Sequence, residues 1–187
     1  CSGDGVFIGQ YQHSHIPNNN YFAWNECSYS PHNAIEATFA NGNIYKHNNC
    51  NYSDYGFWLG YSFNSVVDSN EVIGNYHSGI AIDRGFSNNI SHNMIRNNPI
   101  GIELWEGSPI SGYTSFHSQD YPIHHNTFDG NTMAISSVNT KHATIFDNDF
   151  RYNQTSSLFF DGTSATDSIT ANTFRMPTGY HIYNNST

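Results

Sequence analysis

An asparagine that returns every 22 to 24 residues constrains the fold of this chain more than any other feature. Each copy has an apolar residue three positions before it and an apolar or cysteine residue two positions after it. A repeat of this length predicts stacked coils, because an antiparallel sandwich would instead show hairpin turns about every 8 to 12 residues. The repeated positions, which include one longer interval of 33 residues, are Asn25, Asn48, Asn70, Asn93, Asn126, Asn148 and Asn172.

Each coil also contains a short segment in which apolar and variable residues alternate, as in Gly79-Ile80-Ala81-Ile82-Asp83. Such alternation predicts a strand with one buried side and one displayed side. Since one coil cannot bury its own apolar face, coils must stack about 4.8 Å apart, and stacked asparagines then pair at the turns. We therefore predict one all-β domain over residues 1–187, a parallel β-solenoid of about eight coils. The alternating segments open at Gly5, Ala34, Gly56, Gly79, Gly101, Ala134, Ser157 and Gly179.

The composition excludes two classes of protein. The formal charge is −9 and the chain has only six lysine and arginine residues, whereas nucleic-acid binding needs clustered cations. No apolar run reaches the roughly 20 residues that span a bilayer. We therefore expect neither a nucleic-acid partner nor a membrane span, and the same acidity disfavours unaided binding of a polyanionic glycan.

The repeat N-x-I/F-x-x-N-x-x-x-G-I-x-I, which residues 70–82 illustrate with valine at the third position, resembles the right-handed parallel β-helix repeats of the pectate-lyase-like superfamily. Such repeats occur in carbohydrate-binding and sugar-hydrolase proteins, in NosD-like proteins and in alginate epimerases. The resemblance covers residues 5–183 and implies a right-handed β-helix. We expect the protein to be secreted or on the cell surface. The resemblance selects no activity, because the Asp-Pro-His-Glu motif of alginate epimerases and the signature motifs of polygalacturonases and pectate lyases are absent.

Two coils are longer than the others. About seven extra residues centre on 11–18, and about ten centre on 106–121. Both insertions follow the same strand of the coil, so we expect them to project from one edge, roughly 19 Å apart, and to flank a trough. The alternative is that turn length simply varies along a solenoid.

Three carboxylates and two tryptophans are predicted to share the displayed face between these insertions. Glu103 and Asp83 occupy neighbouring coils with an offset of two residues, so their Cα atoms should lie about 8 Å apart. Glycoside hydrolases use carboxyl groups about 5 to 10 Å apart, and close carboxylates raise the pKa of one of them, as a general acid requires. We predict Glu103 and Asp83 as the catalytic pair, with Glu36 and Asp83 as the alternative. The first displayed position holds Phe7, Glu36, Trp58, Ala81, Glu103, Ser136, Phe159 and His181.

The predicted substrate contacts surround this pair. Tryptophan rings stack on the apolar faces of sugars, and an arginine and a tyrosine that continue the strands can orient Asp83 or a substrate hydroxyl. A histidine just before the strand of Glu36 can donate a proton. The alternative is that these exposed acidic residues have no role in binding and only keep this face of the protein soluble. The predicted substrate-binding residues are Trp58, Trp105, Arg84, Tyr61 and His32.

The preferred function is hydrolysis of a neutral or lightly charged polysaccharide without a cofactor. A polysaccharide lyase or epimerase is less favoured, since it needs a base and a cation for the uronate carboxylate. Only Arg84 is well placed for that purpose, and Ca²⁺ on Glu36, Asp83 or Glu103 would have to assist it. A glycan-binding adhesion module or a segment of a tailspike-like trimer is the non-catalytic alternative.

The histidines predict no metal site. A histidine column precedes three of the repeated asparagines, but Ser69 interrupts it, so a solvated turn position is the better interpretation. His13 and His15, in the first insertion, are a candidate rim contact or metal pair. The column consists of His47, His92 and His125.

The cysteines and the ends of the chain complete the expectations. Cys27 and Cys50 occupy the same inward position in consecutive coils, within the Cα separation of a disulfide, but parallel side chains in register favour buried free thiols. Cys1 has no partner in either case. Both ends of the solenoid lack a cap, so we expect further coils or another chain at one end, with residues 1–187 a processed product or part of a longer chain.

Overall fold

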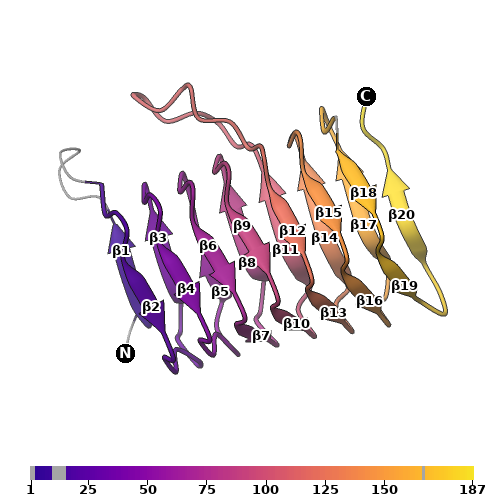
Figure 1. Ribbon diagram of the computed structural model, residues 1–187, viewed down its shortest axis with the longest axis horizontal. Coiled ribbons are helices and arrows are strands. Elements are labelled where there is room, and N and C mark those ends of the chain that lie inside the picture. The colour runs from indigo at the N-terminus through magenta and orange to yellow at the C-terminus, as the bar shows by residue number, and fades with distance from the viewer. Residues whose placement is uncertain (1–2, 10–15, 166) are drawn as a thin grey trace.

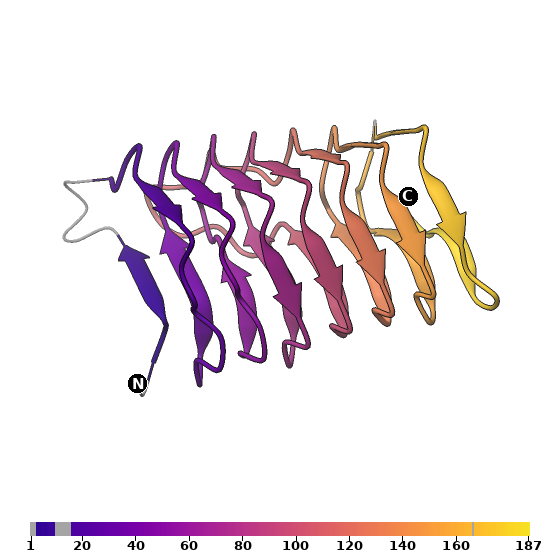
Figure 2. The same cartoon turned by 60° about the horizontal axis from the view of Figure 1, so that its bottom comes forward.

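A computed structural model describes residues 3–9, 16–165 and 167–187, and it is a parallel β-solenoid built from twenty short strands. Strands of successive coils lie side by side along one long axis, with the N-terminal coils at one end and the C-terminal coils at the other (Figures 1 and 2). All pairings between the named strands are parallel, so each coil adds one layer to each wall. The predicted all-β solenoid is confirmed, and the expected number of about eight coils agrees with the eight strands of the largest wall.

The strands form three sheets. The eight-stranded sheet contains β1 (Val6–Gly9), β3 (Asn33–Thr38), β5 (Tyr55–Trp58), β8 (Ser78–Asp83), β11 (Ile100–Trp105), β14 (Met133–Val138), β17 (Ser156–Asp161) and β20 (Tyr180–Asn184). The seven-stranded sheet contains β2 (Tyr21–Ala23), β4 (Ile44–Lys46), β6 (Val66–Asp68), β9 (Asn89–Ser91), β12 (Pro122–His124), β15 (Thr144–Phe146) and β18 (Ser168–Thr170). The five-stranded sheet contains β7 (Glu71–Ile73), β10 (Met94–Arg96), β13 (Thr127–Asp129), β16 (Asp149–Arg151) and β19 (Thr173–Arg175).

Columns of like side chains fill the space between the sheets. Ile80 pairs in register with Phe57 on one side and Ile102 on the other, and all three are fully buried. On the five-stranded sheet, Phe128 stacks on Phe150 with ring centroids 4.9 Å apart. Apolar burial of this kind is the main stabilising term, and it needs the neighbouring coil, since one coil has no second layer.

The repeated asparagines form the buried ladder that their spacing predicted. The backbone N–H and side-chain amide of Asn70 both donate to Oδ1 of Asn93, at 2.9 and 3.0 Å, and the Asn70 amide also donates to the Tyr45 carbonyl at 2.9 Å. Asn93 repeats the pattern toward Asn126 in the next coil. Every rung satisfies backbone groups that the turn would otherwise bury unpaired, so the ladder joins adjacent coils.

Two details of the register and the core refine the sequence analysis. In the last coil Tyr183, not His181, pairs with Phe159, so the expected alignment of β20 was wrong by two residues. The glycine that opens this coil, Gly179, takes a left-handed φ of 83°, so the turn before β20 differs from the others. Cys27 and Cys50 are buried free thiols, as predicted, whereas Cys1 lies outside the described residues.

Candidate functional site

The outer face of the eight-stranded sheet brings together the predicted aromatic residues. Trp58 and Trp105 meet edge to face with ring centroids 5.5 Å apart, and Tyr55 lies 5.0 Å from Trp58. Ala81 pairs in register with Trp58 from the outer face and is nevertheless 0% exposed, because its small side chain leaves room for these rings. Tyr55, Trp58 and Trp105 are called the aromatic cluster below.

A pocket of about 360 Å³ lies beside the aromatic cluster. Burial raises the pKa of Glu36, which stands in register with Trp58 and accepts a 2.6 Å hydrogen bond from the Asn33 amide. A carboxyl group of raised pKa next to an aromatic wall suits acid chemistry as well as ligand binding. The pocket is lined by His32, Asn33, Glu36, Tyr55 and Trp58.

The predicted catalytic carboxylates lie on adjacent strands with the expected offset. Glu103 pairs with Ala81, and Asp83 pairs with Trp105, so the two acids are diagonal neighbours on β8 and β11. Burial raises the pKa of Asp83, whose Oδ1 accepts the Gly107 N–H at 2.8 Å. Glu103 instead accepts a 2.5 Å hydrogen bond from Ser78 Oγ, which fixes the position of its carboxyl group. The two acids therefore have different environments, as an acid and a base require.

Arg84 and Tyr61 fasten the segment of residues 106–121. The Arg84 guanidinium donates to the carbonyls of Gly107 and Phe116, at 2.6 and 2.7 Å, and Tyr61 donates to the Ser108 carbonyl at 3.2 Å. Arg84 and Tyr61 are only 6% and 5% exposed. Sequence analysis placed both beside the substrate, but in the structure their polar atoms contact this segment.

The segment 106–121 does not project from the solenoid to form one wall of the predicted trough. It leaves β11 and runs back along one edge toward the N-terminal coils (Figure 1). Its Phe116 packs against Phe63 and Phe86 with centroids 5.5 and 5.3 Å away, and Tyr113 reaches Phe39 at 4.5 Å. The expected projection was wrong for this insertion, because its aromatic residues find apolar partners on the earlier coils. The other insertion, including His13 and His15, falls largely outside the described residues.

Asp4, His32 and Glu36 form a cluster that sequence analysis missed as a unit. His32 Nδ1 lies 2.6 Å from Asp4 Oδ1 and 3.7 Å from Glu36 Oε2. The hydrogen bond to Asp4 is the main cause of the raised pKa of His32. The sequence pattern that could have revealed the cluster is an alternation of aspartate and histidine just before successive strands of one sheet. These residues are Asp4, His32, Asp54 and His77.

A second group of histidines lies at the C-terminal ends of β9 and β12, two interior strands of the seven-stranded sheet. Nδ1 of His124 is 2.9 Å from Nδ1 of His125, and the ring of His92 stacks on that of His125 at 5.0 Å. His92 Nδ1 pairs with Asp68 at 2.9 Å. His92 and His125 both have left-handed φ values of about 55°, which direct the chain around the turn and leave the rings outside. His92, His124 and His125 are called the histidine cluster below.

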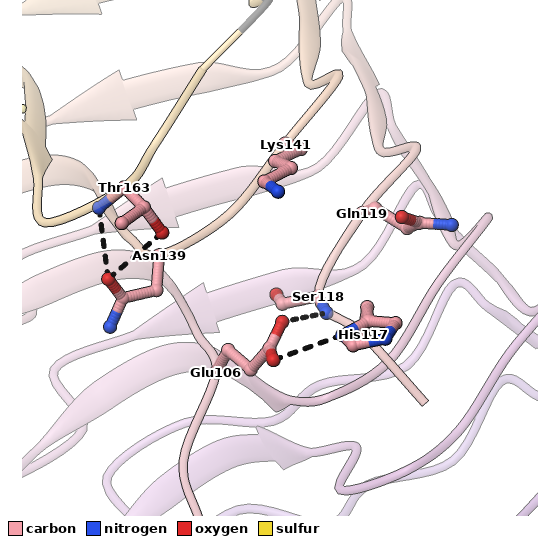
Figure 3. Close-up of a pocket in the computed structure, with 7 residues that line it drawn as sticks. All are labelled: Glu106, His117, Ser118, Gln119, Asn139, Lys141 and Thr163. Carbon is pink, nitrogen blue, oxygen red and sulfur yellow. Dashed lines mark hydrogen bonds and ion pairs between the residues drawn. The ribbon is translucent and has the colours of Figure 1, made fainter. Parts of the chain in front are cut away.

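A polar pocket of about 340 Å³ lies at the edge where the segment 106–121 rejoins the solenoid (Figure 3). Glu106 bonds to both His117 and the Ser118 N–H there, at 3.1 and 3.2 Å. Lys141 also lines it, and is the one lysine or arginine of the described residues without a carboxylate within 4.0 Å. None of the predicted site residues lines this pocket. Within the described ranges, no helix has the length and apolar character needed to cross a membrane.

Comparison with known proteins identifies the scaffold. The model of the family described as "Periplasmic copper-binding protein (NosD)" matches residues 2–186, and no curated protein matches the chain. A point mutant of the periplasmic alginate epimerase AlgG is similar in structure at 15% identity and a TM-score of 0.57, covering 98% of this chain and 48% of AlgG. A second AlgG mutant has 14% identity and a TM-score of 0.50, over 97% of this chain and 55% of AlgG.

Two of these findings bear on the sequence analysis. The chain spans about half the length of the AlgG structures, and at this identity the likeness shows the fold alone. The family is described as periplasmic, which agrees with the predicted secreted or cell-surface location.

Proposed function

The chain belongs to the NosD family, and we propose that the outer face of its eight-stranded sheet binds a polysaccharide and hydrolyses it with Asp83 and Glu103. The observation that carries this proposal is the aromatic cluster lying beside two carboxylates of different environment. Aromatic rings offer flat apolar surfaces to sugar rings, and carboxylates accept hydrogen bonds from hydroxyl groups. The formal charge of −9 favours a neutral or lightly charged chain over a polyanion.

The two acids take different roles in this mechanism. Asp83, whose pKa is raised by burial, keeps its proton to higher pH and donates it to the glycosidic oxygen as the bond to the anomeric carbon breaks. Glu103, oriented by the hydrogen bond from the Ser78 hydroxyl, faces the positive charge that develops at that carbon, either directly or through a water molecule. Water supplies the hydroxyl group of the new reducing end and the proton that returns to Asp83.

The test is a screen of polysaccharides in which binding and product release are measured together. We expect new reducing ends without unsaturated sugars, and a loss of about 100-fold or more in turnover for Glu103→Gln with binding retained. Asp129→Asn, on the five-stranded sheet, is the matched control and should leave turnover unchanged. Detection of unsaturated uronates would show a lyase reaction that uses Ca²⁺ instead of hydrolysis. Binding without any product would show that the protein only recognises a glycan.

A second candidate function is copper binding, which the family description suggests and the histidine cluster supports. The 2.9 Å between the Nδ1 atoms of His124 and His125 is close to the spacing of about 2.8 Å between two ligands that meet at a right angle about 2.0 Å from one metal ion, as in square-planar copper sites. Imidazole is a preferred ligand of copper, and the hydrogen bond of His92 Nδ1 to Asp68 leaves Nε2 free and fixes the ring. Among the described residues, the three histidines do not bring three ligand atoms within 4.8 Å of one another, so His124 and His125 would hold the copper ion as a pair, with His92 beside them.

Copper binding is tested by titrating the protein with Cu²⁺ and following the electron paramagnetic resonance spectrum and the heat of binding. We expect one bound ion with nitrogen hyperfine structure, and at least a 10-fold loss of affinity when His124 and His125 are both changed to alanine. His47→Ala, in the same column of turn residues but stacked on Trp24, is the matched control. Equal losses in the control and the double variant would overturn the assignment.

A further inference from the structure

We propose that Asp4, His32 and Glu36 form a binding site for a divalent cation at the N-terminal end of the pocket beside the aromatic cluster. One ligand atom from each residue lies within 4.8 Å of the other two. The three residues come from different coils or positions, Asp4 before β1, His32 before β3 and Glu36 within β3, and the stacking of coils brings them together. Neither the family description nor the sequence analysis assigns this group of residues to a metal.

A neighbouring pair shows what distinguishes this cluster from an ordinary ion pair. Two coils further on, His77 Nδ1 pairs with Asp54 Oδ1 just as His32 pairs with Asp4. Glu36 follows His32 by four positions, and the residue four positions after His77 is Ala81, which lies in the same register row as Glu36. The second pair therefore lacks the additional carboxylate, and it forms no three-residue group of potential ligands. Of the two pairs, the first has a third ligand, Glu36, and so reaches the three protein ligands that an open metal site uses.

Asn33 supplies the independent sign of a missing ligand. Its side chain is 1% exposed, and its Oδ1 is buried without a hydrogen-bond partner. Its amide nitrogen meanwhile donates to Glu36 Oε2 at 2.6 Å and lies 3.1 Å from His32 Nδ1, and its backbone N–H donates to Asp4 Oδ1 at 2.9 Å. Rotating the amide by 180° exchanges its nitrogen and oxygen. After that rotation the oxygen faces the cluster as a further metal ligand, in place of the nitrogen that donates to Glu36, while the backbone N–H still orients Asp4.

The donor set indicates which cation binds. One imidazole nitrogen and two carboxylate oxygens suit Zn²⁺ or Mn²⁺ better than they suit an ion that prefers thiolate ligands. Zinc binds both ligand types at about 2.0 to 2.2 Å. His32 and Glu36 line the pocket together with Tyr55 and Trp58, so a remaining coordination position faces the space beside the aromatic cluster. If the proposed glycan function holds, on which this last step rests, a sugar hydroxyl or carboxylate occupies that position.

The cation site is tested first without any glycan. Metal-free protein is titrated with Zn²⁺ and with Mn²⁺ by calorimetry, in a background in which His124 and His125 are alanine so that the histidine cluster contributes nothing. We expect one ion per chain and at least a 10-fold weaker affinity for Glu36→Gln and for His32→Ala. Asp54→Asn and His77→Ala, in the two-residue pair, should bind as the background does.

Folding and function are separated from binding by two further measurements. Thermal unfolding of every variant without metal shows whether a loss of affinity reflects a loss of structure, and the cation should raise the melting temperature of the background but not of Glu36→Gln. No binding, or equal losses in both pairs, would overturn the site. If the cation binds but glycan affinity is the same with and without chelator, the link to the pocket fails; if no glycan binds at all, the proposed function fails while the cation site stands.

Discussion

The buried asparagine ladder and the outer face of the eight-stranded sheet belong to the same coils but follow opposite rules. The ladder has the same residue in seven successive coils, and each rung makes the same pair of bonds to the next. The outer face changes at every coil, from Glu36 to Trp58 to Ala81 to Glu103 along one row. A position that repeats in every coil is one whose side chain binds the same residue in the next coil. A position that varies from coil to coil has no such partner to match, so its side chain can be selected for binding a ligand.

The largest effect is expected from breaking the ladder at its centre. Asn93→Ala removes the acceptor of two Asn70 N–H groups and the donor to the Val67 carbonyl, all in a buried site. We expect a loss of about 3–4 kcal/mol in the free energy of unfolding, measured by urea denaturation. Asn25→Ala, at the exposed end of the same ladder, should cost less than about 1 kcal/mol. Equal losses at both positions would contradict a stabilising role for stacked rungs.

The next effect concerns the segment 106–121, where the chain departs most from the repeat. Arg84→Met leaves the Gly107 and Phe116 carbonyls and the Glu106 carboxylate without their buried cation. We expect a loss of about 2–3 kcal/mol and faster proteolysis within this segment. Arg96→Met, which removes a half-exposed pair with Asp129, should cost about 1 kcal/mol or less. Unchanged proteolysis in Arg84→Met would show that the aromatic contacts alone hold the segment.

A smaller effect distinguishes the outer face from the other surfaces. Trp58→Ala removes the central ring of the aromatic cluster and should weaken glycan binding about 10-fold with little change in stability, as calorimetry and thermal melting can show. Trp24→Ala removes an exposed ring at the end of the seven-stranded sheet and should leave the affinity unchanged. An affinity loss in both variants would place the glycan elsewhere.

The smallest effect tests the environment of Asp83. Burial raises its pKa in the folded chain, so the folded state binds the proton more tightly than the unfolded chain does. This contribution to stability is present below the ordinary carboxyl pKa and is lost as the pH rises through the raised value. Asp83→Asn should therefore melt higher than the parent protein at pH 7, by no more than a few degrees, and lose that advantage at pH 3. A difference independent of pH would contradict the effect of burial.

The candidate site was predictable only where it followed the repeat. Glu103, Asp83 and both tryptophans lie in the predicted rows, because the register of parallel strands follows directly from the period. Arg84 and Tyr61 were assigned to substrate because they continue two of those strands, but the segment 106–121 folds back over them. The direction of that segment depends on contacts such as Phe116 with Phe86, for which no local pattern exists.

The sequence by itself determined the all-β solenoid, the ladder and most of the residues that share the outer face, with the last coil as the exception. It could do so because every coil has the same partners one period away, which turns a three-dimensional contact into a fixed spacing. Only the tertiary structure decided how Asp4 meets Glu36, how the unpaired Oδ1 of Asn33 is buried and where the long segment lies. These contacts join turns and insertions of differing length, so side-chain packing, and not periodicity, selects their partners.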